Sequence, residues 1–148
     1  MQTLRNTASS LVLSLIAQFM LAGDLSADTV VVTTTSDVAD SRDGYCSLRE
    51  ALRAIAGDTA DSSCTVVTSS DALVRLPGGT YCVISELVIT TSLRLESAPF
   101  STATLDAGND SATTCSTGSE SRILEIDADA SVTLKGLIIR GGKHASAG

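Results

Sequence analysis

Hydrophobic residues follow three different patterns along the chain. Near the N-terminus they form one almost uninterrupted run over residues 11–21. Between Leu48 and Ile55 they recur with the i, i+3, i+4, i+7 spacing of one helix face. From Leu73 onward they occur in short alternating pieces separated by Gly, Pro, Asn and Asp, which is typical of strands joined by turns. The pattern therefore predicts a chain of strands with one short helix.

The middle pattern predicts a helix over Ser47–Ile55. Ser47 followed by Glu50 is a capping box, in which each side chain accepts the backbone N–H of the other residue. Gly57 is a natural stop signal. A helix of about three turns is marginal in water by itself, so its apolar face must be buried. The side chains expected to cover a core are Leu48, Leu52 and Ile55.

The predicted strands are short. Residues 28–38 are rich in β-branched side chains and predict a first strand. Residues 73–84 predict a strand, a Pro-Gly-Gly turn and a second strand. Further along, Leu93 and Leu95 flank Arg94, so alternate side chains are expected to face the same side.

A weak internal repeat relates residues 87–108 to residues 124–142, with a predicted loop over residues 109–121 between the copies. The matching positions, at nearly constant spacing, are Ile89 with Ile126, Leu93 with Val132, and Leu95 with Leu134. Because the repeat spans several strands in the same order, it favours a parallel β-helix, whose coils stack their inward side chains into ladders. The alternative fold is a small β-sandwich.

Composition and charge narrow the class of partner. The chain has 148 residues and a formal net charge of −7, and aromatic residues make up only 3% of it. An acidic chain has no basic patch that would release counterions from a phosphate backbone, so we expect no nucleic-acid partner. The contact with a membrane that we expect is the passage of the chain across it during export.

The N-terminal run predicts a signal peptide over residues 1–27. Arg5 supplies the basic region, the apolar run is too short to span a bilayer comfortably, and Ala27 is a plausible cleavage site. Cleavage at Ala22 or Gly23, or retention of the segment as an uncleaved anchor, are the alternatives. The expected location is outside the cytoplasm: secreted, in the outer membrane or at the cell surface.

Four cysteines follow the predicted signal peptide, at positions 46, 64, 82 and 115. An even number in an exported chain favours disulfides. Of the three possible connectivities, the sequential pairing of Cys46 with Cys64 and Cys82 with Cys115 closes the shortest separate loops. No C-x-x-C spacing occurs and His144 is the single histidine, so the sequence predicts neither a zinc site nor another cofactor.

Charged residues offer few candidates for catalysis. Asp106 with Asp110, and Asp127 with Asp129, are the carboxylate pairs that could bind calcium or hydrolyse a glycoside, although both lie in turn-like sequence. Arg49 and Glu50 are adjacent, but capping explains Glu50, and a structural hydrogen-bonding role is expected for Arg49. A disulfide is a simpler expectation for Cys46 than a role as nucleophile. No catalytic residue is therefore predicted.

Residues 46–51, C-S-L-R-E-A, spell the signature of a known family, the CSLREA-type N-terminal domain. The segments R-L-P-G-G-T-Y (75–81), L-D-A-G (105–108) and V-T-L-K-G-L-I-I-R-G-G (132–142) also resemble that family. The resemblance covers nearly the whole chain after residue 27. It implies an exported protein with a right-handed parallel β-helix behind a short capping helix.

The resemblance implies two functions, since members look like autotransporter passengers and adhesins or like pectate lyases. The first hypothesis is a structural or adhesive module that binds an extracellular glycan or another surface ligand. The alternative is the N-terminal part of a carbohydrate-active enzyme whose site lies in further coils. Residues 28–72 would form the strand, capping helix and disulfide loop, and residues 73–148 the first coils. The sequence also predicts that the β-helix has an open end after Ile139, with unpaired backbone groups, which further coils or a partner would cover.

Overall fold

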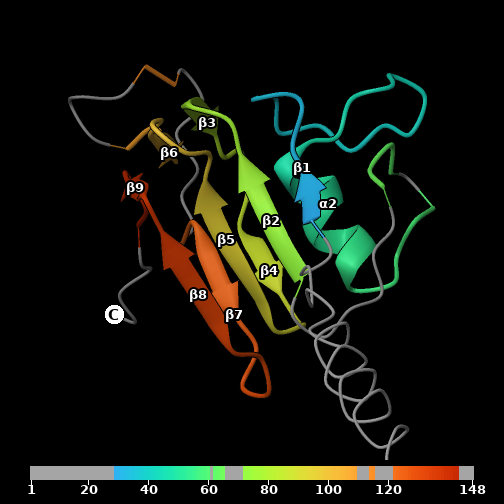
Figure 1. Ribbon diagram of the computed structural model, residues 1–148. Coiled ribbons are helices and arrows are strands. Elements are labelled where there is room, and N and C mark those ends of the chain that lie inside the picture. Colours follow the sequence, from blue (N-terminus) through green and yellow to red (C-terminus); the bar gives the residue numbers. More distant parts are fainter. Residues whose placement is uncertain (1–28, 61, 66–71, 110–113, 116–121, 144–148) are drawn as a thin grey trace, which may run out of the picture.

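The computed structural model describes residues 29–60, 62–65, 72–109, 114–115 and 122–143 (Figure 1). The predicted signal peptide, Asp110 and His144 lie outside these ranges. The described residues contain one helix, α2 (Leu48–Ile55). The strands are β1 (Thr29–Val31), β2 (Ala72–Leu76), β3 (Gly79–Cys82), β4 (Leu87–Ile89), β5 (Leu93–Ser97), β6 (Ala103–Asp106), β7 (Leu124–Ile126), β8 (Val132–Lys135) and β9 (Leu137–Arg140).

The strands form three parallel sheets. Sheet A contains β1, β2, β5 and β8 in that order, sheet B contains β3, β6 and β9, and sheet C contains β4 and β7. From β2 onward the chain passes through sheets A, B and C in turn and then returns to sheet A one strand further along. All six pairings are parallel within the described residues. A β-sandwich pairs its strands in antiparallel fashion, so that alternative is wrong here.

The register of the sheets reproduces the sequence repeat. Leu93 pairs with Val132 and Leu95 with Leu134 between β5 and β8. Ile89 pairs with Ile126 between β4 and β7. The residues that correspond in sequence are therefore stacked neighbours in space, and the repeat unit is one passage through the three sheets.

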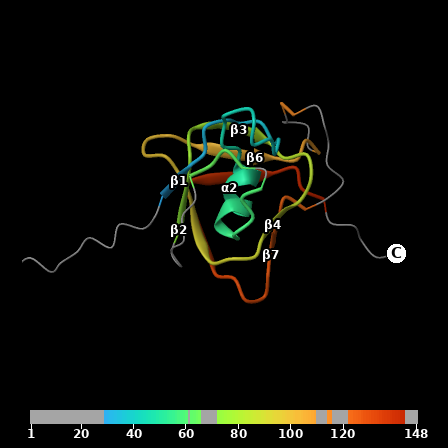
Figure 2. The same cartoon turned by 90° about the vertical axis from the view of Figure 1, so that its right-hand side faces the viewer.

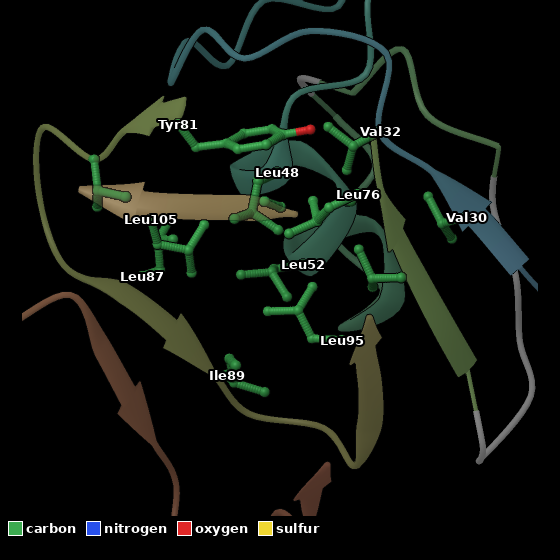
Figure 3. Close-up of a cluster of buried hydrophobic side chains, with 14 of the residues drawn as sticks. Val30, Val32, Leu48, Leu52, Leu76, Tyr81, Leu87, Ile89, Leu95 and Leu105 are labelled. Carbon is green, nitrogen blue, oxygen red and sulfur yellow. The ribbon is translucent and has the colours of Figure 1, made fainter. Parts of the chain in front are cut away.

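The core fills the space that the three sheets enclose. Leucine and isoleucine side chains from each sheet point into it, and the largest fully buried ones are Leu76, Leu87, Ile89, Leu95 and Leu105 (Figure 3). Helix α2 lies across one end of this space and contacts β2 and β4 (Figure 2). Leu48 and Leu52 lie on the side of α2 that faces the core and are buried. Ile55, at the end of the helix, packs against the core and is partly exposed. The three side chains expected to cover the core do so.

The first strand is much shorter than predicted. Residues 28–38 were expected to be extended as one strand, whereas β1 ends at Val31. The reason is a change of hydrogen-bond partner. Val32 still donates its N–H to Arg75, but Thr33 donates to the carbonyl of Cys46 at 2.8 Å, and its hydroxyl accepts the N–H of Cys46 at 2.8 Å. The chain thus leaves sheet A to meet the segment that starts α2.

Strand β2 spans the position of the predicted boundary after residue 72. β1 pairs with β2 along its whole length, so residues on both sides of the boundary share sheet A. Val30 and Val32 belong to the same buried cluster as Leu76 and Leu95. The capping segment and strands β2 and β5 therefore share one core.

Strands β7, β8 and β9 lie at the end of the sheets opposite α2, and no further strand of the described residues pairs with them (Figure 1). Their inward side chains are correspondingly exposed: Ile126 is 44%, Leu134 40% and Ile139 43% accessible. These residues stack on the buried Ile89, Leu95 and Leu105 of the preceding coil.

Candidate functional site

The start of α2 is fastened by the predicted capping box. Ser47 is the N-cap residue, and its hydroxyl accepts the N–H of Glu50 at 3.2 Å. The Glu50 carboxylate in turn accepts the N–H of Ser47 at 2.8 Å. Both residues are buried, so the Glu50 side chain is part of the fold and is not exposed to a ligand.

Arg49 ties α2 to two other segments. Its guanidinium makes a bidentate ion pair with Asp37, with Nε to Oδ1 at 2.8 Å and Nη2 to Oδ2 at 2.7 Å. It also donates to the carbonyl of Ser85 at 2.8 Å and to that of Glu86 at 3.1 Å. Asp37 Oδ2 accepts the N–H of Ile84 at 2.9 Å. Arg49 and Asp37 together therefore hold the loop before α2 and the loop before β4 in one place.

Two disulfides join the four cysteines. Cys46 is bonded to Cys64 and Cys82 to Cys115, which is the sequential pairing favoured by the sequence. The first bond attaches the residue before the N-cap of α2 to the loop that follows the helix. A cysteine in a disulfide has no thiolate, so none of the four acts as a nucleophile or a metal ligand in this state. Disulfides are typical of proteins in an oxidising compartment.

Asp106 forms a buried ion pair. Its Oδ2 accepts bonds from Arg140 Nε at 3.0 Å and Nη2 at 2.8 Å, and its Oδ1 accepts the N–H of Gly108 at 2.8 Å. The carboxylate is fully buried, and the Arg140 side chain is 28% exposed. Gly141 fits against this pair because a Cβ there would lie 3.1 Å from Asp106 Oδ1. The acid that was a candidate for catalysis is held by structural partners.

The other candidate carboxylates that the structure describes are exposed. Asp127 and Asp129 lie in the turn between β7 and β8, where the N–H of Ala130 donates to the carbonyl of Asp127 at 3.0 Å. The turn that the sequence around Asp127 and Asp129 indicated is therefore the conformation that the structure shows. Within the described residues, no group of three or more His, Cys, Asp or Glu side chains could hold a metal ion.

A small cavity of about 270 Å³ lies between α2 and β4, lined by Arg49, Leu52, Arg53, Glu86, Leu87 and Val88. Its charged groups have nearby partners. Arg53 bonds Asp58 at 2.7 Å and lowers the pKa of that carboxyl. Arg122 bonds Glu86 at 2.6 Å, and this hydrogen bond lowers the pKa of Glu86. The cavity is therefore lined by charged side chains that have partners and by the apolar side chains of Leu52, Leu87 and Val88.

Three residues with a specific contact or an unusual conformation were not predicted from the sequence. Asp37 and Arg140, which pair with Arg49 and Asp106, carry no local signal, because their partners lie 12 and 34 residues away. Phe100 is the third, a fully exposed aromatic with a positive φ of 59°. The sequence Pro-Phe between two strands signals a turn, which was the available clue.

Comparison of the chain with models of protein families, with curated proteins and with solved structures gave no match. Within the part of the chain that the structure describes, no helix is long and apolar enough to cross a membrane.

Proposed function

We propose that this chain is the N-terminal module of an exported protein built as a right-handed parallel β-helix, with a structural and adhesive role outside the cell. The order of the strands carries the proposal. The chain passes through three parallel sheets in a constant sequence, and one end of the enclosed core is covered by α2. The connections from β2 to β5 and from β5 to β8 join parallel neighbours in one sheet, and such crossovers are right-handed in about 98% of cases.

The proposal includes membership of the CSLREA-type domains. In support, every residue of the hexapeptide has a defined role in covering the end of the sheets. Cys46 forms a disulfide, Ser47 and Glu50 cap the helix, Leu48 and Ala51 are buried, and Arg49 binds Asp37. A motif whose residues all serve one cap is a structural signature, so it indicates how the fold begins and leaves ligand recognition to other parts of the surface.

Export is proposed from two observations that point the same way. Residues 1–27 have the arrangement of a signal peptide. Both disulfides require an oxidising compartment to form and persist. Together they favour a secreted or surface location.

An adhesive role is favoured over catalysis because the described candidate carboxylates have structural explanations. Asp106 is bound by Arg140, and Asp127 and Asp129 belong to a turn. A stack of parallel sheets presents its outward side chains in regular rows, which suits the binding of an extended ligand.

Export and adhesion are tested separately. The full-length chain is produced in a bacterial host, and the exported fraction is sequenced from its N-terminus and titrated for free thiols. We expect cleavage after Ala27 and no free thiol. The purified protein is then tested for retention on immobilised extracellular polysaccharides and on cell surfaces.

The enzymatic alternative is tested with polygalacturonate and calcium, by following the ultraviolet absorbance of an unsaturated product. Turnover that is lost in Asp127→Asn while the melting temperature is unchanged would overturn the adhesive proposal. Retention on a surface without turnover would support it. A protein that stays in the cytoplasm with reduced cysteines would contradict export.

A further inference from the structure

Phe100 occupies a backbone conformation that an aromatic residue rarely adopts. The chain reverses between β5 and β6 in a turn over residues 98–101, closed by the N–H of Ser101 donating to the carbonyl of Ala98 at 3.1 Å. Pro99 is the second residue of this turn and Phe100, with a φ of 59°, is the third. A turn with proline second and a positive φ third ordinarily has glycine or asparagine there. A bulky side chain at this position reduces the stability of the fold, because its Cβ is crowded by the backbone.

The surrounding residues hold the turn rigidly in this shape. Ser97 Oγ donates to the carbonyl of Ser101 at 2.9 Å, and Ser101 Oγ donates to that of Ala98 at 2.8 Å. The preceding coil packs closely beneath the turn, since a Cβ on Gly78 would lie 3.0 Å from the Cβ of Ser101. The ring is therefore presented by a fixed support, and little conformational entropy would be lost when a ligand binds it.

The fold makes no use of the Phe100 ring. Its relative exposure is 109%, while Tyr81, the aromatic residue in the core, is 3% exposed. The loop between β5 and β6 projects from the side of the three sheets in Figure 2. Burial of the ring thus contributes nothing to stability, and its backbone conformation reduces stability. A strained and exposed aromatic residue is a candidate for binding.

Three threonine residues lie in sheet B or in the segment that joins the turn to it. Thr102 is exposed two residues after Phe100, and the N–H of Gly79 donates to its carbonyl at 3.2 Å. Thr80 and Thr104 pair in register on β3 and β6, and they alternate with the buried Tyr81 and Leu105, so they face outward. Sheet B therefore presents two adjacent threonine side chains near the strand ends closest to the Phe100 turn, with the exposed Ile138 of β9 next to Thr104.

We propose that Phe100 is a stacking platform for a neutral pyranose unit of an extracellular glycan, with Thr80, Thr102 and Thr104 as hydrogen-bonding neighbours. This inference rests on the adhesive role proposed above and names its ligand class. The C–H bonds on one face of a pyranose are attracted by the negative face of an aromatic ring. The hydroxyls at its edge need donors and acceptors of the kind that threonine provides.

Charge favours a neutral sugar over an anionic lipid surface or a polyuronate, and area favours it over a protein partner. The net charge of −7 disfavours an anionic lipid surface or a polyuronate. A protein partner usually needs an interface that buries more than about 1,000 Å² in total, with a packed apolar centre. The residues next to Phe100 along the chain are Ala98, Pro99, Ser101 and Thr102, which offer two hydroxyl groups and no second aromatic ring. A single exposed ring with hydroxyl groups on neighbouring residues is sufficient for a sugar.

The test is affinity electrophoresis of the full-length chain in native gels that contain galactomannan, xyloglucan or mixed-linkage β-glucan, with polygalacturonate as the anionic comparison. We expect retardation by at least one neutral polysaccharide and none by polygalacturonate. Phe100→Ala should weaken binding about tenfold or more. Phe100→Trp should retain it, since the ring is kept. Ile84→Ala is the matched control, because Ile84 is an exposed hydrophobic residue, 52% accessible, away from this turn.

Phe100→Gly separates binding from folding. Glycine adopts the positive φ without cost, so this variant should melt at a higher temperature than the wild type while its retardation is lost. Absence of retardation of the wild type in all three neutral gels would overturn the proposal. If the protein is retained on a cell surface and Phe100→Ala is retained equally well, the adhesive role stands and the role of Phe100 is wrong.

Discussion

Asp106 and Arg140 occupy matching positions on the neighbouring strands β6 and β9, and their side chains form an ion pair whose carboxylate is completely buried. The backbone register of sheet B places the two charges side by side. A buried carboxylate is tolerated only when it is paired and hydrogen-bonded, and both conditions are met here. The pair therefore links strands β6 and β9 through their side chains as well as through the backbone.

Replacement of Asp106 by asparagine tests this structural role. The amide could still accept the N–H of Gly108, but the partly buried guanidinium of Arg140 would lose its counter-charge. We expect the free energy of unfolding to fall by about 2–3 kcal/mol. The measurement is urea denaturation followed by circular dichroism. Asp129→Asn, in the exposed turn, is the control and should change stability by less than about 0.5 kcal/mol. Equal stability of the two variants would contradict the role of the pair.

Arg49→Lys removes the bidentate geometry and keeps the charge. Lysine cannot reach both oxygens of Asp37 and the carbonyls of Ser85 and Glu86 together, because its donors sit on one atom. We expect a loss of about 1–3 kcal/mol in the free energy of unfolding. Arg42→Lys is the matched control, since Arg42 is 89% exposed in its pair with Asp40. If both substitutions are equally mild, Arg49 contributes only its charge.

Leu52→Asp places a charge on the side of α2 that faces the core. Leu52 is buried against the core, where a carboxylate would have no hydrogen-bond partner. The expected loss exceeds about 4 kcal/mol and should leave the protein insoluble or unfolded. Val38→Asp, at an exposed position, should express and melt like the wild type. A Leu52→Asp protein with a wild-type melting curve would show that α2 does not cover the core.

The phenol of Tyr81 should lose its proton at a higher pH than an exposed tyrosine does. Burial raises the pKa of its phenol from 10.0 to about 12. The fold favours the neutral form, so the stability that Tyr81 contributes is fully present below pH 10 and is lost as the pH rises through about 12. The sequence has two tyrosines, so in a Tyr45→Phe variant the phenolate absorbance reports Tyr81 alone. A native midpoint near 10, the same as in denaturant, would contradict the burial.

Prediction from the sequence was most accurate where a feature is local or repeated. Ser47, Glu50 and the apolar spacing are all within one segment, so the helix and its cap were predicted almost to the residue. The repeat gave the stacking of Leu95 on Leu134, because stacked coils need apolar side chains at the same position. The length of β1 was predicted wrongly, since Thr33 bonds Cys46 and that partner is not visible in the strand itself.

The sequence by itself determined the elements: short strands of alternating residues, one capped helix, and four cysteines in an order that favours sequential pairing. These follow from backbone propensity and from the need to bury one face of each element. The tertiary structure alone decided which charges meet. Asp106 pairs with Arg140 because parallel stacking brings together residues that are distant along the chain. Asp37 pairs with Arg49 because the loop between β1 and α2 folds back against the helix. It also decided that the Phe100 ring faces solvent, since the packing of Gly78 beneath Ser101 fixes the turn that carries it.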